Sequence, residues 1–184
     1  MKLHLLSKGL LTLMATAALS WGATYGVDAS HSKVSFKIKH MMISNVTGHF
    51  NTFDGTFDVT DNKLSALKGT VDVASVDTDN AKRDGHLKAP DFFDVANHPT
   101  MTFVMKKRDK NYIIGDLTIR GVTKSVTFIE EFGGEIEDPW GNQRAGLTLT
   151  ARIDRTAFGV SYAANSTTLA NELDIILELE GIAK

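Results

Sequence analysis

The fold is decided by the stretch Leu173-Asp174-Ile175-Ile176-Leu177-Glu178-Leu179-Glu180 near the end of the chain. Every odd-numbered residue in this stretch is apolar, and three of the even-numbered residues are acidic. A β-strand turns successive side chains to opposite faces, so the pattern predicts a strand with one apolar and one polar face. A chain made of such strands must bury many apolar faces, and the simplest way to do so is to close the sheet on itself.

The same alternation recurs in residues 34–40, 67–73, 101–105, 113–119, 126–128 and 147–154. A weaker, aromatic-rich run covers residues 50–59 and is interrupted by Gly55. Residues typical of turns, such as Asp61-Asn62 and Gly133-Gly134, separate the runs. The spacing predicts an all-β fold of about eight or nine antiparallel strands in one domain, as a barrel or a sandwich.

Residues 79–93 break this rhythm and predict a short helical segment. Asp79 is a plausible N-cap, Pro90 stops the helix, and Gly85 weakens it. The apolar residues of the segment are expected to cover an apolar surface, and they are Leu87, Phe92 and Phe93.

Length and composition narrow the function classes. The 184 residues carry a formal net charge of -2 and include no cysteine. The charge is near neutral and no dense cluster of Lys and Arg occurs, so nucleic-acid binding is not expected. The absence of cysteine excludes disulfides, thiolate zinc sites and a thiol nucleophile.

Residues 1–22 have the composition of a signal peptide. The first eight residues include Lys2, His4 and Lys8, and an apolar run follows at residues 10–19, too short to span a bilayer. Small residues then favour a cut after Gly22, leaving residues 23–184 as the mature domain. We therefore expect an exported, periplasmic protein without stable membrane insertion. The alternative is an uncleaved N-terminal anchor.

The motifs of common enzymes are absent from the sequence. No pair of histidines has the spacing of a helical zinc site, and neither a G-x-S-x-G elbow nor a nucleotide-binding glycine motif occurs. We expect no catalytic residue, no bound metal and no cofactor. A metal site assembled from distant loops stays open as an alternative.

Arg83, Asp84 and His86 form the densest polar cluster beside apolar residues. Guanidinium and imidazole groups both donate hydrogen bonds to oxygens, so Arg83 and His86 suit an anionic or polar head group. Alternatively, Arg83 and Asp84 only tie the helix to the sheet. Arg155 allows the same two interpretations, a contact with a head group or a purely structural tie.

The aromatic and methionine side chains on the apolar faces also allow two interpretations. They either fill an ordinary core or line a ligand tunnel, because a filled barrel and a hollow barrel share the same periodicity. A barrel of about eight strands is of a size at which both outcomes occur.

A series of ordered motifs covers the chain from about Tyr25 onward. They are residues 27–36 (Val-Asp-Ala-Ser-His-Ser-Lys-Val-Ser-Phe), Lys39-His40, Gly48-His49-Phe50, residues 83–88 (Arg-Asp-Gly-His-Leu-Lys), Asp91-Phe92-Phe93-Asp94, His98-Pro99, Thr102-Phe103, residues 115–123, and Ile153-Asp154-Arg155 with Phe158-Gly159. In these motifs the chain resembles the YceI family of bacterial periplasmic polyisoprenoid-binding proteins.

The resemblance implies a closed, lipocalin-like antiparallel barrel that carries a long apolar molecule, such as a polyisoprenoid, an isoprenoid quinone or a fatty amide. It favours the hollow barrel and makes a homodimer plausible. The expected tunnel-lining residues are Phe36, Ile38, Phe92, Phe93, Met101, Phe103, Leu117, Ile119, Phe128, Leu149 and Ile175. The expected head-group contacts are Arg83, His86 and His40. The alternatives are an enzyme acting on a lipid-like substrate and a filled barrel acting through its surface.

Overall fold

The computed structural model describes residues 22–184, in which eleven strands form one antiparallel sheet. The predicted signal peptide lies outside the described residues except for Gly22. The strands are β1 (Ala23–Val27), β2 (Lys33–His40), β3 (Ser44–Phe50), β4 (Phe53–Thr60), β5 (Lys63–Asp72), β6 (Val76–Asp77), β7 (Thr100–Asp109), β8 (Tyr112–Ile119), β9 (Val122–Glu137), β10 (Gln143–Asp154) and β11 (Leu169–Ala183).

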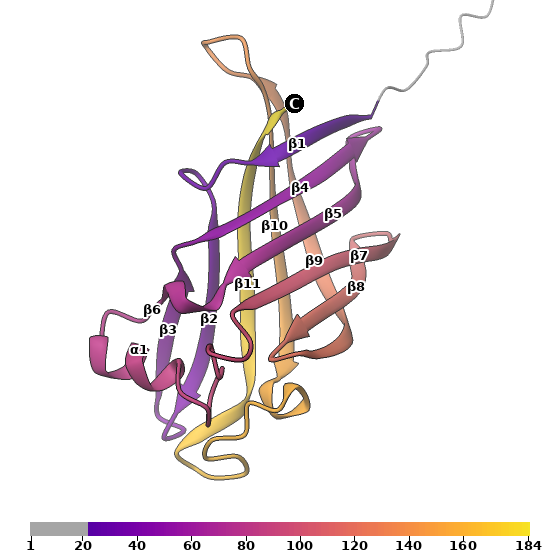
Figure 1. Ribbon diagram of the computed structural model, residues 1–184. Coiled ribbons are helices and arrows are strands. Elements are labelled where there is room, and N and C mark those ends of the chain that lie inside the picture. The colour runs from indigo at the N-terminus through magenta and orange to yellow at the C-terminus, as the bar shows by residue number, and fades with distance from the viewer. Residues whose placement is uncertain (1–21) are drawn as a thin grey trace, which may run out of the picture.

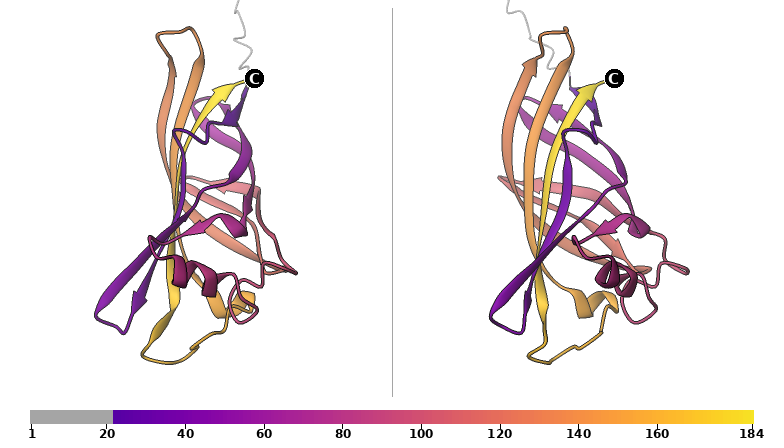
Figure 2. Two further views of the ribbon diagram at one scale, coloured as in Figure 1. Left: turned by 60° about the vertical axis from the view of Figure 1, so that its left-hand side comes forward. Right: turned by 90° about the vertical axis from the view of Figure 1, so that its left-hand side faces the viewer.

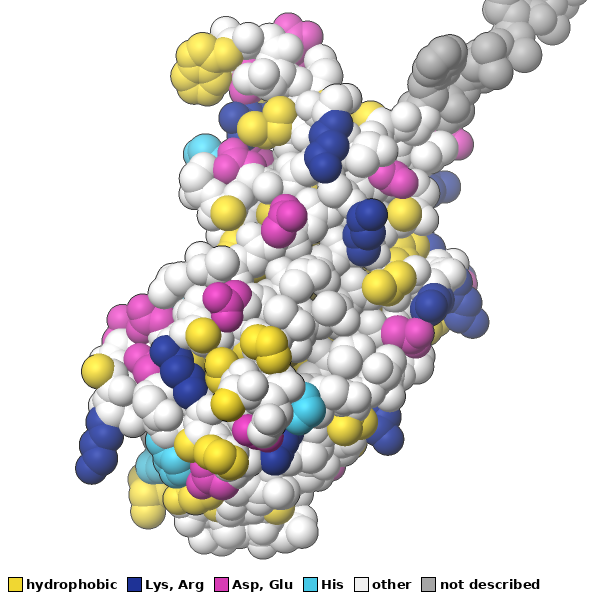
Figure 3. All heavy atoms as spheres, in the orientation of Figure 1, with side chains coloured by type: hydrophobic (Ala, Val, Ile, Leu, Met, Phe, Trp, Pro, Cys, Tyr) yellow, Lys and Arg dark blue, Asp and Glu magenta, His cyan; other side chains and the backbone are white. Residues whose placement is uncertain are grey.

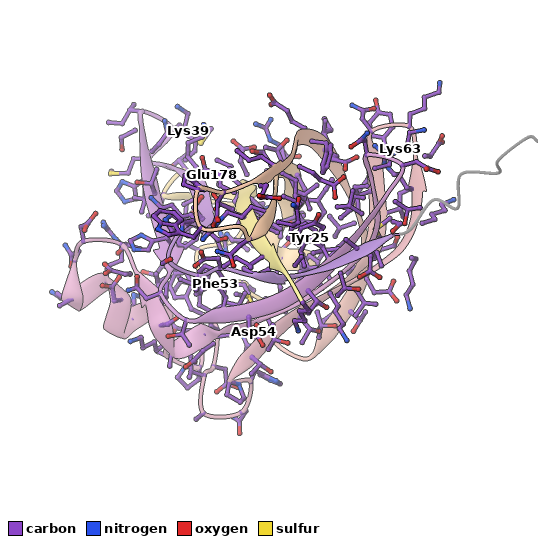
Figure 4. All side chains as sticks on the ribbon, turned by 90° about the horizontal axis from the view of Figure 1, so that it is seen from above. Tyr25, Lys39, Phe53, Asp54, Lys63 and Glu178 are labelled. Carbon is purple, nitrogen blue, oxygen red and sulfur yellow. The ribbon has the colours of Figure 1, made fainter. Side chains whose placement is uncertain are left out.

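Eight of these strands close into a ring, which confirms the predicted antiparallel barrel. The order around the ring is β1-β4-β5-β7-β8-β9-β10-β11, and β11 pairs back to β1 (Figure 1). The decisive stretch lies within β11, where Leu177 is opposite Leu149 of β10 and Ile175 is opposite Phe36 of β2. Seen from above, the strands surround Tyr25, whereas Lys63 lies at the outer edge (Figure 4).

One edge of β11 serves two partners in turn. Its end at Gly181–Ala183 pairs with β1, and the part from Leu169 to Glu178 pairs with β2. β3 and β6 then continue the sheet beyond β2. The β2–β3 hairpin consequently leaves the ring and leans outward at its tip (Figure 2). This end of the barrel is the one that faces the helix.

The predicted helical segment contains α1 (Ala81–Leu87), and two 3-10 turns, η1 (Val73–Ser75) and η2 (Arg155–Phe158), join strands. The expected N-cap is wrong by one residue. Asn80 caps α1, because its backbone is extended and its side chain accepts a hydrogen bond from the Arg83 amide. Asp79 has a φ of 59° and belongs to the turn before the helix.

The apolar core fills only part of the barrel. Its completely buried side chains come mainly from the ring strands and are Tyr25, Phe57, Val59, Leu64, Val73, Ile113, Phe128 and Leu149. In residues 22–184, no helix is long and apolar enough to cross a membrane. The remaining interior, toward α1, contains the candidate site.

Candidate ligand-binding site

A cavity of about 400 Å³ lies inside the barrel and reaches the segments around α1 and η2. Most of its lining is apolar, contributed by ring strands, β2, α1 and the segment after η2. Its aromatic lining residues are Phe36, Phe50, Phe53, Phe92, Phe93, Phe103, Phe128, Phe158 and Tyr162. The size and the apolar lining are typical of pockets for small molecules.

A pair of glycines explains part of the space. Gly55 of β4 and Gly69 of β5 are directly opposite each other and both line the cavity. They occupy the inward positions between Phe53 and Phe57 and between Leu67 and Val71. A methyl group on Gly69 would meet only the Asp54 carbonyl within 4 Å, at 3.5 Å, so the cavity borders the strand backbone at this position. The sequence had indicated Gly55 only as an interruption of a strand.

Two further glycines let aromatic rings lie close to the barrel wall. A methyl group on Gly48 would collide with the ring of Phe36, and one on Gly115 would collide with the ring of Phe103. The two rings therefore occupy the space that side chains at these positions would fill. Both rings line the cavity.

The structure places almost all predicted lining residues around the cavity. Those that line it are Phe36, Ile38, Phe92, Phe93, Met101, Phe103, Leu117, Ile119, Phe128 and Ile175. The exception is Leu149, which is fully buried among core side chains. The cavity reaches β10 at Ile153, so Leu149 lies in the packed part of the same strand.

Four cavity-lining residues at the α1 end are also open to solvent in part or in full: His40, His86, Tyr162 and Thr168. We refer to these four residues as the mouth of the cavity. They come from β2, α1 and the segment between η2 and β11. The mouth thus offers polar groups that could orient a ligand at this end of a mostly apolar space.

His86 is the best-fixed residue of the mouth. Its Nε2 lies 2.8 Å from Asp91 Oδ2, and its ring packs edge-on against Phe92 at 4.9 Å and Tyr162 at 4.8 Å between centroids. The hydrogen bond from His86 lowers the pKa of the Asp91 carboxyl below its ordinary value. This arrangement fixes the imidazole beside the aromatic entrance.

Arg83 lines the cavity but is also bound to the protein. Its Nε donates to Thr78 Oγ1 at 2.7 Å and its Nη2 donates to the Thr78 carbonyl at 2.6 Å. Asp84 accepts hydrogen bonds from the amide and hydroxyl of the same Thr78. Both residues therefore tie α1 to the end of β6, which leaves Nη1 of Arg83 without a hydrogen bond to the described residues. A head-group contact by Arg83, His86 or His40 remains a prediction.

Arg155 is a buried cation in the cavity wall. It is 3% exposed, and burial lowers the pKa of its guanidinium. Its Nη1 donates to the Val160 carbonyl at 2.7 Å and its Nε donates to the Ala170 carbonyl at 2.9 Å. Arg155 thus holds both ends of the segment between η2 and β11. The sequence allowed such a structural role for Arg155 but could not identify its partners, because they are backbone carbonyls.

A second polar cluster lies away from the cavity, where β1, β10 and β11 meet. One ligand atom each from Asp28, His31 and Glu180 lies within 4.8 Å of the others. Arg144 already occupies this cluster: its Nη1 is 3.0 Å from Asp28 and 2.7 Å from Glu180, and its Nε is 2.7 Å from Asp138. The cluster is therefore an ion-pair network, and the expectation that the chain binds no metal stays a prediction.

Comparisons with known proteins agree with this architecture. The model of the YceI-like domain matches residues 25–181. A UPF0312 protein of Vibrio vulnificus is 37% identical over 193 residues, covering 100% of both chains. The crystal structure of Campylobacter jejuni YCEI protein has a TM-score of 0.74 at 35% identity, covering 80% of this chain and 91% of that one.

A more distant structure shares the fold alone. A polyisoprenoid binding domain from Saccharophagus degradans matches with a TM-score of 0.63 at 13% identity, covering 88% of this chain and 99% of that domain. The YceI-like match covers nearly all of the described residues, and the relatives are similar along their whole length. The observed fold agrees with both findings. The chain belongs to the YceI-like domain family.

Proposed function

We propose that this protein is an exported carrier that encloses a long apolar molecule, such as a polyisoprenoid, an isoprenoid quinone or a fatty amide. The observation that carries the proposal is the mostly apolar cavity whose mouth carries His40, His86, Tyr162 and Thr168. Removing apolar surface from water stabilises a complex by roughly 25 cal/mol for each Å². A chain-like ligand offers much such surface, and the cavity accepts it without a covalent step.

The polar residues at the α1 end suit a head group that accepts hydrogen bonds. His86 and His40 offer ring nitrogens, and Arg83 retains Nη1 as a donor. Arg155 adds a buried positive charge to the wall. Amide, quinone and phosphate oxygens are all acceptors of such donors. The shared fold with the polyisoprenoid binding domain from Saccharophagus degradans supports the same ligand class.

Native mass spectrometry tests the carrier function. Protein isolated from the periplasm of expressing cells is expected to retain a lipid, released on denaturation and identified by its mass. Delipidated protein is then offered a polyprenol, a ubiquinone and a long-chain fatty amide. Protein that is isolated empty and takes up none of the three would refute the proposal.

Export and assembly need separate measurements. We propose that residues 1–22 are cleaved and that the mature protein is periplasmic, for which the N-terminal sequence of periplasmic protein is the test. A homodimer remains a prediction, and light scattering of the mature protein measures it. We assign no catalytic residue, metal or cofactor to the site.

A further inference from the structure

The tip of the β2–β3 hairpin presents three apolar side chains to solvent. Met41 and Met42 are each 56% exposed and Ile43 is 85% exposed. In the space-filling view, apolar side chains gather at the lower left of the molecule, where Figure 1 places this hairpin (Figure 3). Three adjacent apolar residues on a surface indicate a contact with something apolar.

The backbone of this tip makes the choice of residues unusual. Met41 and Met42 have φ values of 49° and 61°, and the Ile43 amide donates to the His40 carbonyl at 3.2 Å. Residues 41–43 connect the paired His40 and Ser44, and hairpin-loop positions with positive φ favour Asn, Asp and Gly. The β4–β5 turn of the same protein follows that preference with Asp61 and Asn62, whose φ values are 53° and 55°. At the β2–β3 tip, two methionines thus occupy positions with positive φ, where the backbone would favour Asn, Asp or Gly.

The tip is continuous with the mouth of the cavity. The Met41 amide donates to the carbonyl of Thr168 at 2.9 Å, and His40 pairs with Leu169. His40 and Thr168 both line the cavity. The two segments that build this end, residues 40–46 and 160–171, contain no Asp, Glu, Lys or Arg. These two segments thus give the tip side of the opening an uncharged, partly apolar surface, whereas the α1 side carries His86 and its partner Asp91.

The charges nearest to the tip on β2 are positive. Lys37 and Lys39 lie on the outward face of β2, and Figure 4 shows Lys39 at the outer edge of the molecule. Asp174, the partner of Lys37 at 3.7 Å, is also paired with Arg152 at 2.7 Å. The remaining nearby carboxylate, Glu172, is exposed on β11. Cations behind an apolar tip complement a surface of anionic lipid head groups.

The opposite end of the barrel has a different character. The β9–β10 hairpin exposes Ile136 and Trp140, the latter to 80%, but places them beside the exposed Glu135 and Glu137. Figures 1 and 2 show this hairpin at the end of the molecule away from the β2–β3 tip. Its acidic surroundings are repelled by anionic lipids, so it serves as an internal control.

We propose that Met41, Met42 and Ile43 dock the mouth of the cavity on the surface of an anionic phospholipid bilayer. The three side chains enter the head-group region, and Lys37 and Lys39 lie against the lipid phosphates. The purpose of this contact rests on the proposed carrier function, because an apolar ligand can then pass between bilayer and barrel without crossing water. The contact itself is measurable without any ligand.

Vesicle sedimentation tests the contact. Periplasmic protein is mixed with vesicles of phosphatidylethanolamine and phosphatidylglycerol, and the bound fraction is measured. The variant Met41→Asn/Met42→Gly/Ile43→Ser is expected to bind at least about tenfold more weakly, because the buried apolar surface is lost. Its turn then has preferred residues, so its melting temperature is expected to stay equal or rise, which separates lost binding from lost folding.

The matched control is Ile136→Ser/Trp140→Ser, which removes exposed apolar side chains from the far end and is expected to bind as the wild type does. A fluorescence experiment reports orientation: in the mature chain Trp140 is the single tryptophan, and its emission is expected not to change with vesicles. Moving the tryptophan to the tip, in Met42→Trp/Trp140→Phe, is expected to give a blue shift with vesicles.

Three outcomes would overturn the docking proposal: no vesicle binding by the wild type, undiminished binding by the tip variant, or a change in oligomeric state as the only effect of the tip substitutions. Native mass spectrometry of the same samples keeps the two proposals apart. Protein that holds lipid but ignores vesicles refutes docking alone. Protein that binds vesicles but never holds lipid refutes the carrier function alone.

Discussion

Gly55 and Gly69 face each other across β4 and β5 at positions where their neighbours point large side chains into the barrel. The surroundings of the two glycines differ. A methyl group added to Gly69 would meet only the Asp54 carbonyl within 4 Å, at 3.5 Å, whereas one added to Gly55 would lie 2.7 Å from the Lys68 carbonyl. One glycine therefore borders open space and the other is held by close backbone packing.

Filling the cavity from Gly69 is expected to abolish ligand binding. Gly69→Leu places a branched side chain in the space that the glycine leaves, so the retained lipid falls by roughly tenfold or more. Lipid bound per protein, measured by native mass spectrometry, checks this. Gly69→Ala is the control and is expected to retain lipid. A Gly69→Leu protein that folds and binds normally would show that the ligand lies elsewhere.

Gly55→Ala is expected to lower stability instead. The added methyl group must displace strand backbone, at a cost of roughly 1–3 kcal/mol. Urea unfolding of Gly55→Ala and Gly69→Ala, followed by circular dichroism, measures the difference. Equal stability of the two variants would contradict the conclusion that Gly55 is closely packed and Gly69 is not.

Replacing Arg155 is expected to loosen the segment between η2 and β11. Arg155→Lys replaces the two nitrogens that donate to the Val160 and Ala170 carbonyls with a single ammonium nitrogen, so the free energy of unfolding is expected to fall by roughly 2–4 kcal/mol. Hydrogen exchange is expected to rise in residues 160–170. Unchanged exchange there would show that Arg155 does not hold the segment.

The Arg144 network is expected to make the stability of the fold depend on pH in the acidic range. Hydrogen bonding to Arg144 is the main cause that lowers the pKa of Asp138, and bonds from Ser30, His31 and Arg144 lower that of Asp28 from the ordinary 3.8. A lowered folded-state pKa contributes stability above the ordinary value, and that contribution is lost as the pH falls toward the folded-state value. Arg144→Gln is therefore expected to melt several degrees below the wild type at pH 7, with the gap narrowing toward pH 3.

Arg152→Gln is the matched control for this network. Arg152 also lies on β10 and pairs with a carboxylate, Asp174, but its side chain is 65% exposed, compared with 18% for Arg144. Exposed ion pairs contribute little because water and salt screen them. Melting curves at pH 3, 5 and 7 are expected to show a clearly smaller effect. Equal losses for both variants would argue against a special role of the Arg144 network.

Tyr25 is expected to make the stability of the fold depend on pH in the alkaline range. Burial and the hydrogen bond that its hydroxyl donates to Glu135 at 2.5 Å raise the pKa of Tyr25 to about 12. A raised folded-state pKa contributes stability that is present below the ordinary value of 10.0 and lost as the pH rises toward 12. Absorbance at 295 nm is expected to show a late tyrosine step that disappears in Tyr25→Phe. Retention of that step in the variant would assign it to another tyrosine.

The strand pattern could be read from the sequence because the two-residue period is local. The alternation in β2, β7 and β8 predicted which side chains face inward, and Phe36, Phe103 and Leu117 do so. The helical segment was predicted by its break in this period, although the cap is Asn80 and not Asp79. The sequence indicated Arg83 and His86 because they belong to its densest polar cluster beside apolar residues. Their hydrogen bonds to Thr78 and Asp91 are seen only in the tertiary structure.

The hollow interior depends on residues that are distant in the sequence. Alternation places Leu149 on an inward face, but only the packing of the ring buries it, and only the pairing of β4 with β5 brings Gly55 opposite Gly69. The carbonyl partners of Arg155 likewise carry no side-chain signal. The sequence by itself determined the strands and their faces, because these follow from neighbouring residues, whereas closure of the sheet needs β1 to pair with the distant β11. Only the tertiary structure decided where the barrel is filled and where it is empty, because that depends on which side chains from different strands meet.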